Sequence, residues 1–257
     1  MSTIISFVSQ KGGVGKTTSA VNLATAFAFG GYSVLLVDLD PQSSVKFSMG
    51  IKKRISLGTK ELFLELDVPI SDLTEQTEQD NLSFIFSNIE SIRSEKKVFK
   101  LASDETVLQK RLQPILNQYD FIILDAPAST NNMAVNAIYC SDLIVLPLQC
   151  ESLAIKSLKR FLISFTELQQ RLTGKDLRLA GILLTMYDRD IEVHRKVSQQ
   201  VYKALSDSIF DTIIPRNEAI IEASALGKSV ITYQLNSIGA TAYIRLMNEL
   251  VDKFSLR

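Results

Sequence analysis

The chain has 257 residues, enough for one large α/β domain or two small ones, and 46% of them are hydrophobic. Lysine plus arginine and aspartate plus glutamate both number 28, so the formal net charge is zero. Two distant cysteines and a single histidine argue against an iron–sulfur cluster, a zinc site or a histidine-based triad.

Targeting signals are absent from the sequence pattern. No run reaches the 18 apolar residues needed to span a bilayer, and no basic segment precedes the first apolar run. We therefore expect a cytoplasmic protein.

Short apolar runs recur along the chain and alternate with helical patterns. The runs are continuous, as expected of strands buried on both faces. The predicted strands are 4–8, 34–37, 82–86, 121–124, 143–148, 179–184 and 212–214. The predicted helices are 18–29, 153–172, 193–205 and 240–254, with His194 exposed on the third. This order predicts an α/β fold with a doubly wound, mostly parallel sheet and helices on both faces.

No linker rich in glycine, proline or serine divides the chain, so we expect a single domain over residues 1–257. Residues 42–118 are the least regular part. Within them, the charge-rich stretch 93–100 is read as a solvated helix or loop without assigned chemistry.

A glycine-rich segment, SQKGGVGKTTSA at residues 9–20, follows the first predicted strand and opens the first predicted helix. This context is what a phosphate-binding loop requires. Gly12, Gly13 and Gly15 allow backbone conformations closed to other residues, so that successive amides, including that of Val14, can cradle phosphates. The helix dipole adds to the attraction of anions.

The side chains of the loop complete the expected site. Lys16 supplies a positive charge to the outer phosphates, Thr17 is the expected Mg²⁺ ligand, and Thr18 is expected to reach an inner phosphate. The usual pattern GxxxxGK[ST] would place glycine where Gln10 stands, and Lys11 follows it. The loop thus fits the deviant form KGGxGK[ST].

Two carboxylates, Asp38 and Asp40, follow the second predicted strand in VLLVDLDPQ. Strand alternation puts both on the same side, at the edge of the sheet where ligands bind in open α/β folds. Phosphoryl transfer needs a group that orients the attacking water, and Mg²⁺ needs oxygen ligands. Asp38 is expected to help the magnesium shell or to hold the loop. A turn carboxylate without chemistry is the alternative for each.

A third carboxylate, Asp125, ends the apolar run FIIL. A buried strand that delivers one acid behind a phosphate loop is the Walker B pattern, in which the carboxylate serves Mg²⁺, often through water.

Seven segments resemble those of the ParA/Soj/MinD deviant Walker ATPases in the same order, and most resemble the ParA/Soj partition branch. They are QKGGVGKTT, LLVDLDPQ, YDFIILDAPAS, DLIVLPLQCE, GILLTMYDRD, IIPRNEAIIEA and GATAYIRLMNEL. The resemblance implies a P-loop NTPase fold in which Lys11 reaches the partner subunit's nucleotide and Asp40 orients the water. It also implies that Pro215 and Asn217 contact the adenine. Ala128 stands where the family's switch segment has a second proline.

The family's cycle implies MgATP as the cofactor and a homodimer that sandwiches the nucleotide. It also implies a slow ATPase stimulated by a ParB-like protein, and non-specific DNA binding on the nucleoid during plasmid or chromosome partition. DNA binding needs cations aimed at phosphates. The candidates are Arg189, Arg195, Lys196 and Lys203, which could equally be solvated charges; Ala219 stands where the family often has arginine.

The main alternative is a MinD-like membrane-positioning ATPase, a class that ends in a basic amphipathic helix. Residues 248–257 carry two acids and two bases and resemble the end of a packed helix, so no stable membrane anchor is expected. Biosynthetic ligases with the same loop, iron-protein reductases and a non-hydrolysing scaffold are weaker alternatives. Only eight residues precede the loop, so we expect no operator-binding helix-turn-helix.

Overall fold

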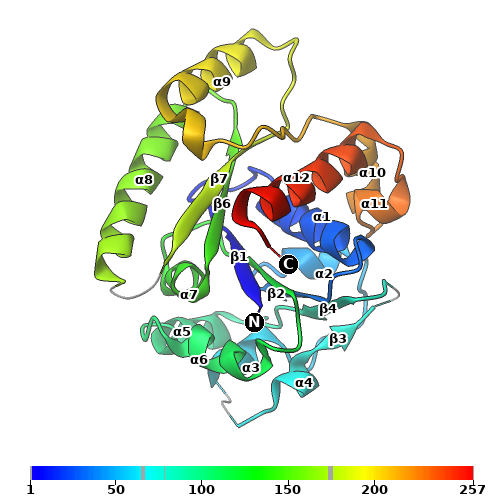
Figure 1. Cartoon of the computed structure of the whole chain (residues 1–257). Coiled ribbons are helices and arrows are strands. Elements are labelled where there is room, and N and C mark those ends of the chain that lie inside the picture. Colours follow the sequence, from blue (N-terminus) through cyan, green and yellow to red (C-terminus); the bar gives the residue numbers. More distant parts are fainter. Residues whose placement is uncertain (1, 65–66, 78, 173–175, 257) are drawn as a thin grey trace.

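The computed structural model describes residues 2–64, 67–77, 79–172 and 176–256 (Figure 1). Its described strands form one seven-stranded sheet of order β3-β4-β2-β5-β1-β6-β7. The strands are β1 (Thr3–Phe7), β2 (Val34–Asp38), β3 (Glu75–Gln76), β4 (Leu82–Ile85), β5 (Phe121–Asp125), β6 (Leu143–Gln149) and β7 (Arg178–Thr185). Every neighbouring pair is parallel except β3 with β4, so the predicted fold class is confirmed.

Twelve helices are found in the described ranges, together with two 3₁₀ turns at Gln113–Ile115 and Ser206–Ser208. They are α1 (Lys16–Phe29), α2 (Ser44–Ser48), α3 (Thr59–Leu64), α4 (Ile70–Leu73), α5 (Ile92–Leu101), α6 (Val107–Leu112), α7 (Asn132–Cys140), α8 (Ala154–Arg171), α9 (Glu192–Leu205), α10 (Glu218–Ala225), α11 (Val230–Tyr233) and α12 (Ile238–Phe254). None of the described helices is both long enough and apolar enough to cross a bilayer.

The helices cover both faces of the sheet, and each face has its own core. Because side chains alternate along a strand, Ile4 of β1 enters one core while Ile5 and Phe7 enter the other. The first core packs α3–α9 against the sheet, and the second packs α1, α2 and α10–α12. Figure 1 shows α8 on one side of the central strands and α1 with α12 on the other.

Helix α1 is the buried helix that the site depends on. It begins directly after Gly15 and ends at Gly30, whose backbone N–H bonds to the carbonyl of Ala26. Phe27 is fully buried and stacks on Phe121 of β5 with ring centroids 3.9 Å apart. This packing fixes the C-terminal end of α1 over the start of β5, at the edge of the sheet opposite the phosphate loop.

The predicted strand at residues 212–214 is wrong. The segment makes only isolated bridges to its neighbours, at Ile209 and at Pro215. The backbone N–H groups of Asp211 and Thr212 donate instead to the Glu249 carboxylate of α12, at 2.7 and 2.9 Å. Ile214 still donates to the carbonyl of Leu184 in β7 at 2.9 Å, but the occupied Thr212 donor interrupts the regular hydrogen-bond pattern that a strand beside β7 would need.

Two features of the irregular region were not resolved by the sequence. Strand β3 was not predicted, because it is an antiparallel edge strand of only two residues, too short for periodicity to detect. The charge-rich stretch at 93–100 is helical and belongs to α5, which starts with a reciprocal capping box between Ser91 and Ser94.

Two glycines hold α2 against the α10–α11 turn. Gly227 has φ +68°, and a Cβ built there would lie 2.3 Å from Cα of Gly50. Such a contact between backbones leaves no room for any side chain.

We therefore predict that Gly227→Ala lowers the free energy of unfolding by about 3 kcal/mol, from the left-handed backbone and the clash together. Gly31→Ala is the matched control, since Gly31 has φ +91° but nothing within 4 Å of its Cβ position. It should cost only about 1 kcal/mol. Urea unfolding measures both, and equal shifts would contradict the close contact.

Candidate functional site

The phosphate loop adopts the conformation that its glycines were predicted to allow. Gly13 and Gly15 have φ of +75° and +83°, and Gly15 forms the N-terminal cap of α1. The hydroxyl of Thr185, at the end of β7, donates to the carbonyl of Val14 at 2.8 Å. The edge strand β7 therefore supports the loop. The loop amides lie ahead of the N-terminus of α1, where an anion binds.

Lys16 and Thr17 occupy the first turn of α1. Lys16 is buried, with 7% of its surface exposed, and its positive charge lies close enough to Asp125 to favour the charged carboxylate. The Thr17 hydroxyl donates to Oδ2 of Asp125 at 2.6 Å. The loop and the end of β5 thus meet at one point, as the Walker pattern predicts.

Asp38 and Asp125 lie side by side because β2 and β5 are parallel neighbours in which these two residues pair in register. Both are fully buried. Burial, and next the charge of Asp125, hold the pKa of Asp38 well above its usual value. Burial raises the pKa of Asp125 to about 7, against the opposing effects of Thr17 and Lys16. Two adjacent buried acids favour a bound cation.

The two acids differ in how they are used. Asp38 accepts from the backbone N–H of Asp40 at 3.0 Å and of Val45 at 3.2 Å, so it holds the loop after β2, the second of its two expected roles. Oδ1 of Asp125 is buried and has no hydrogen-bond partner among the described residues. A carboxylate oxygen left in this way beside Thr17 suits Mg²⁺, which takes hard oxygen ligands.

Asp40 lies in the turn after β2 and is partly exposed. Its Oδ1 accepts the backbone N–H of Gln42 at 3.0 Å, whereas Oδ2 has no partner in the described ranges. It is near enough to raise the pKa of both buried acids. The residue expected to orient water therefore stands at the solvent side of the carboxylate pair.

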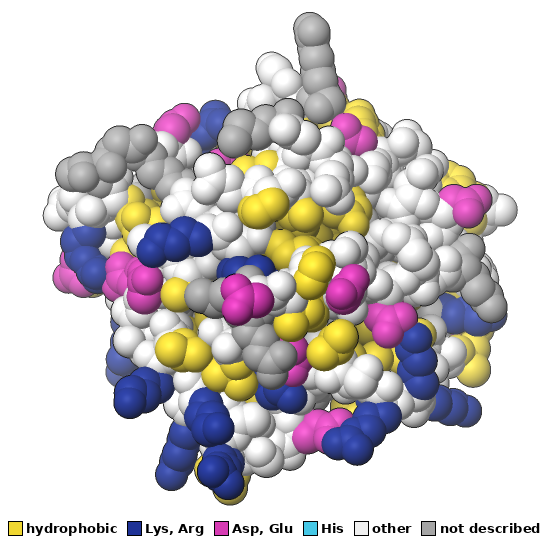
Figure 2. Space-filling view, turned by 90° about the horizontal axis from the view of Figure 1, so that it is seen from below, with side chains coloured by type: hydrophobic (Ala, Val, Ile, Leu, Met, Phe, Trp, Pro, Cys, Tyr) yellow, Lys and Arg dark blue, Asp and Glu magenta, His cyan; other side chains and the backbone are white. Residues whose placement is uncertain are grey.

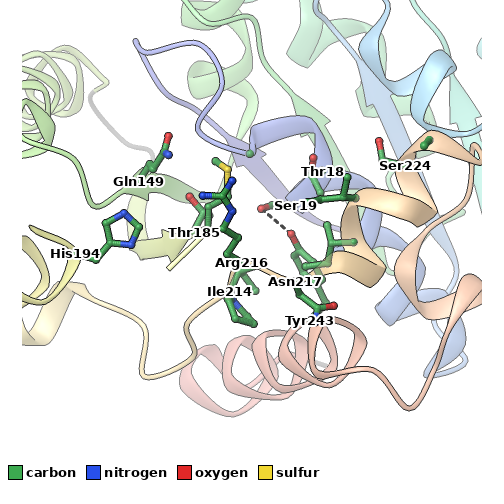
Figure 3. Close-up of a pocket in the computed structure, with 16 residues that line it drawn as sticks. Thr18, Ser19, Gln149, Thr185, His194, Ile214, Arg216, Asn217, Ser224 and Tyr243 are labelled. Carbon is green, nitrogen blue, oxygen red and sulfur yellow. Dashed lines mark hydrogen bonds between the residues drawn. The ribbon is translucent and has the colours of Figure 1, made fainter. Parts of the chain in front are cut away.

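A cavity of about 560 Å³ continues from the loop, and its size suits a small ligand. Gly15 and Thr18 line its phosphate end, and Pro215 and Asn217 line it as predicted for adenine contacts. Oδ1 of Asn217 is buried without a hydrogen-bond partner among the described residues. Figure 3 shows Thr18, Ser19 and Asn217 on one side of the cavity and Gln149 and His194 on the other.

The expectation that His194 is exposed is wrong. It is 7% exposed, it lines the cavity, and its Nδ1 accepts the backbone N–H of Asp188 at 3.0 Å. Its position is set by the buried face of α9, which repeats at three and four residues through Val197 and Val201. That spacing was present in the sequence and could have indicated burial.

Lys11 lies beside the loop but does not line the cavity of its own chain. Its ammonium pairs with the carboxylate of Glu151, just beyond β6, and both side chains are partly exposed. Sequence reasoning missed Glu151 because the two residues are 140 positions apart. Thr185, which also lines the site, was missed for the same reason, whereas Arg216 lines the site between the predicted Pro215 and Asn217 and could have been included with them.

The predicted DNA contacts lie on α9 and the loop before it, and some are already engaged. Lys196 pairs with Glu192 one helical turn earlier, and Nη1 of Arg195 donates to the carbonyl of Arg189 at 2.6 Å. Lys203 is exposed on the same helix. Arg189 lies 4.0 Å from Asp190, so three of these four charges would have to exchange contacts to bind an anion.

A second basic surface lies on α5. Its cations recur at three and four residues and form no ion pair within the described ranges; they are Arg93, Lys96, Lys97 and Lys100. Figure 2 shows Lys and Arg side chains gathered along the lower left edge of the face seen from below. The neutral total charge therefore conceals local basic surfaces.

The chain is similar to known proteins over nearly its whole length. A family model described as an AAA domain matches residues 2–179. The chain is 36% identical over 251 residues to the sporulation initiation inhibitor protein Soj of Bacillus subtilis, covering 97% of this chain and 98% of Soj. It is 35% identical over 250 residues to the chromosome partitioning protein ParA of Myxococcus xanthus, covering 97% and 88%.

Solved structures of ATP- or ADP-binding proteins are also similar to this chain. Cobyrinic acid a,c-diamide synthase from Mycobacterium smegmatis, solved with ADP or an ATP analogue and magnesium, is 28% identical with a TM-score of 0.83, covering 99% of this chain and 96% of that one. The septum site-determining protein MinD from Pyrococcus horikoshii, complexed with Mg-ADP, is 26% identical with a TM-score of 0.82, covering 99% and 98%. The predicted family and fold class are confirmed.

The raised pKa of Asp125 leads to a prediction about stability without metal or nucleotide. A carboxyl whose pKa rises on folding binds its proton more tightly in the native state, so stability falls as pH rises from about 4 to about 7. Asp125→Asn cannot ionise. It should be more stable than the native protein above pH 7, by on the order of 2 kcal/mol, with little difference near pH 4.

Urea unfolding in a chelator at both pH values measures this difference. Asp252→Asn, on the exposed side of α12, is the control and should show no gain that depends on pH. A native protein as stable as Asp125→Asn at pH 8 would contradict the burial of an ionised carboxylate.

Proposed function

The chain belongs to the ParA/Soj family of deviant Walker P-loop ATPases within the ParA/MinD superfamily, and on this premise we propose that it is a DNA-partition ATPase. It binds MgATP as a single P-loop domain and dimerises around the nucleotide. The dimer binds DNA without sequence preference on the nucleoid, in the cytoplasm. A ParB-like partner stimulates its slow hydrolysis.

The observation that carries the proposal is the meeting of loop and acids at one point. Thr17 donates to Asp125, Asp38 lies beside Asp125, and the charge of the buried Lys16 acts on Asp125. In this arrangement the loop amides and Lys16 would hold the phosphates, and Thr17 with the free oxygen of Asp125 would serve Mg²⁺. The ion neutralises charge that develops on the phosphoryl group.

Dimerisation is supported by the position of Lys11. Its ammonium faces Glu151 and lies outside the cavity of its own chain, with 38% of the side chain exposed. A lysine held beside the loop at the surface can meet the nucleotide of a second subunit. The exposed Leu153, two residues beyond Glu151, adds apolar surface to the same region.

DNA binding is supported by the relatives named for chromosome partition and by the exposed cations of α9. Electrostatic contacts with phosphates need no sequence information, so a few lysines and arginines suffice. Ala219 is buried and offers no charge. The binding surface of this chain therefore depends on the loop at Arg189 and on α9.

The membrane alternative finds support in the likeness to MinD, but the C-terminal helix counts against it. Leu246 and Leu250 of α12 are fully buried, and Val251 and Phe254 pack on the same core. A helix that lies in a lipid interface needs its apolar face free. Here that face is already covered by the body of the protein; Arg257 lies outside the described residues.

We predict that Asp40→Ala binds ATP with native affinity but hydrolyses it at least about 100-fold more slowly, because the water loses the group that orients it. ATP-bound dimers should accumulate and can be measured by light scattering. Asp252→Ala, which removes an exposed carboxylate far along the chain, is the control. A native hydrolysis rate in Asp40→Ala would remove Asp40 from the mechanism.

The function is tested by offering the protein random duplex DNA and anionic liposomes, each with and without MgATP. We expect ATP-dependent DNA binding that weakens steeply with salt. Replacing Arg195, Lys196 and Lys203 with glutamine removes six cations from a dimer, so the salt slope should fall by about 5. The matched control replaces Arg93, Lys96 and Lys97 on α5, an equal loss of charge.

The outcomes separate the candidates. Equal losses from the α9 and α5 variants would mean that total charge, not the predicted surface, governs binding. Binding to liposomes in place of DNA, lost when the last ten residues are removed, would favour the membrane function.

A further inference from the structure

His194 stands between the nucleotide cavity and the loop at residues 187–190. His194 lines the cavity, across from Asn217 in Figure 3. Its ring also contacts the backbone of the loop, where Nδ1 accepts the N–H of Asp188 at 3.0 Å. A residue in this position touches both a ligand site and the segment that carries Arg189.

The hydrogen bond fixes the state of the ring. Because Nδ1 accepts, the neutral imidazole carries its proton on Nε2. Within the described chain, Nε2 has no hydrogen-bond partner. A donor without a partner, on a ring that lines a cavity, is suited to an acceptor on a bound ligand.

The loop is also joined to the wall of the cavity. The N–H of Tyr187 donates to the carbonyl of Ile214 at 3.1 Å, and the N–H of Arg216 donates to the carbonyl of Tyr187 at 2.9 Å. Met186, which precedes the loop and lines the cavity, has φ +49°. A non-glycine residue in this region stores strain, which is often found at segments that change state.

We infer that His194 is a positioning residue that couples nucleotide occupancy to the loop at residues 187–190. A nucleotide that fills the cavity restricts the ring and accepts from Nε2–H, which keeps Nδ1 facing the Asp188 amide. When the cavity is empty, the ring rotates more freely and the loop is held less firmly. The ligand thus shifts the population of the held loop by binding that state better.

The inference rests on the ATP binding of the proposed function and names how that binding reaches Arg189. It does not need DNA to be the partner of the loop. The direct readout is the hydrogen-exchange rate of the Asp188 amide, because local exchange reports the opening of that one bond.

The experiment compares the native protein with His194→Asn and His194→Gln, with and without a non-hydrolysable ATP analogue and Mg²⁺. The Asn side-chain oxygen stands about where Nδ1 stands, so it can still accept from Asp188 but cannot reach the cavity. The longer Gln side chain places its amide about where Nε2 stands and leaves Asp188 without its acceptor.

In the native protein we expect the analogue to slow exchange of the Asp188 amide by about tenfold, as expected for strengthening one buried hydrogen bond. His194→Asn should keep the protection seen without nucleotide but gain none from the analogue. His194→Gln should exchange about tenfold faster than the native protein in both conditions.

The Arg178 amide is the internal control, since it donates to the carbonyl of Asp142 at the start of β7, at the end of that strand opposite the loop. General destabilisation would accelerate both amides equally, and that result would overturn the inference. Equal protection of Asp188 by the analogue in His194→Asn would also overturn it, and this comparison decides even if His194→Gln does not fold. Loss of DNA binding with the exchange pattern intact would refute the partition function alone.

Discussion

The whole site depends on two carboxylates that are buried side by side. The parallel pairing of β2 with β5 brings Asp38 and Asp125 to adjacent positions at the edge of the sheet, where both are removed from water. Ionising either carboxyl costs free energy unless a positive charge or hydrogen-bond donors are near. Lys16, the Thr17 hydroxyl and the backbone amides after β2 supply part of this, and the remaining oxygen of Asp125 suits a cation.

Residues from the second half of the chain complete the nucleotide site, whose phosphate loop and acids come from the first half. The loop and the acids lie within the first 125 residues, but the loop is supported by Thr185 and the cavity is closed by residues 214–225 and by Tyr243. Tyr243 is buried and its hydroxyl lies 3.3 Å from that of Ser19 in α1. A nucleotide in this cavity therefore contacts segments from both halves. Through those contacts it can affect the conformation of the loop before α9.

Charge is distributed in a way that the neutral total does not reveal. Cations on α9 are partly engaged with neighbouring groups, whereas those on α5 form no ion pairs among the described residues. Exposed ion pairs contribute little energy, so an incoming phosphate can displace them. The cations of α9 can therefore exchange their present contacts for contacts with an anion.

The phosphate loop, the strand-end acids and the parallel sheet could be predicted from the sequence, because each depends on neighbours in the chain: glycines, a helix start, or an apolar run that ends in aspartate. The sequence also placed Pro215 and Asn217 at the cavity by resemblance. The pairing of Lys11 with Glu151 and the loss of the strand at 212–214 to Glu249 follow from the tertiary structure alone. Those outcomes depend on groups that meet only after folding, and local periodicity holds no information about which distant donor or acceptor will be satisfied there.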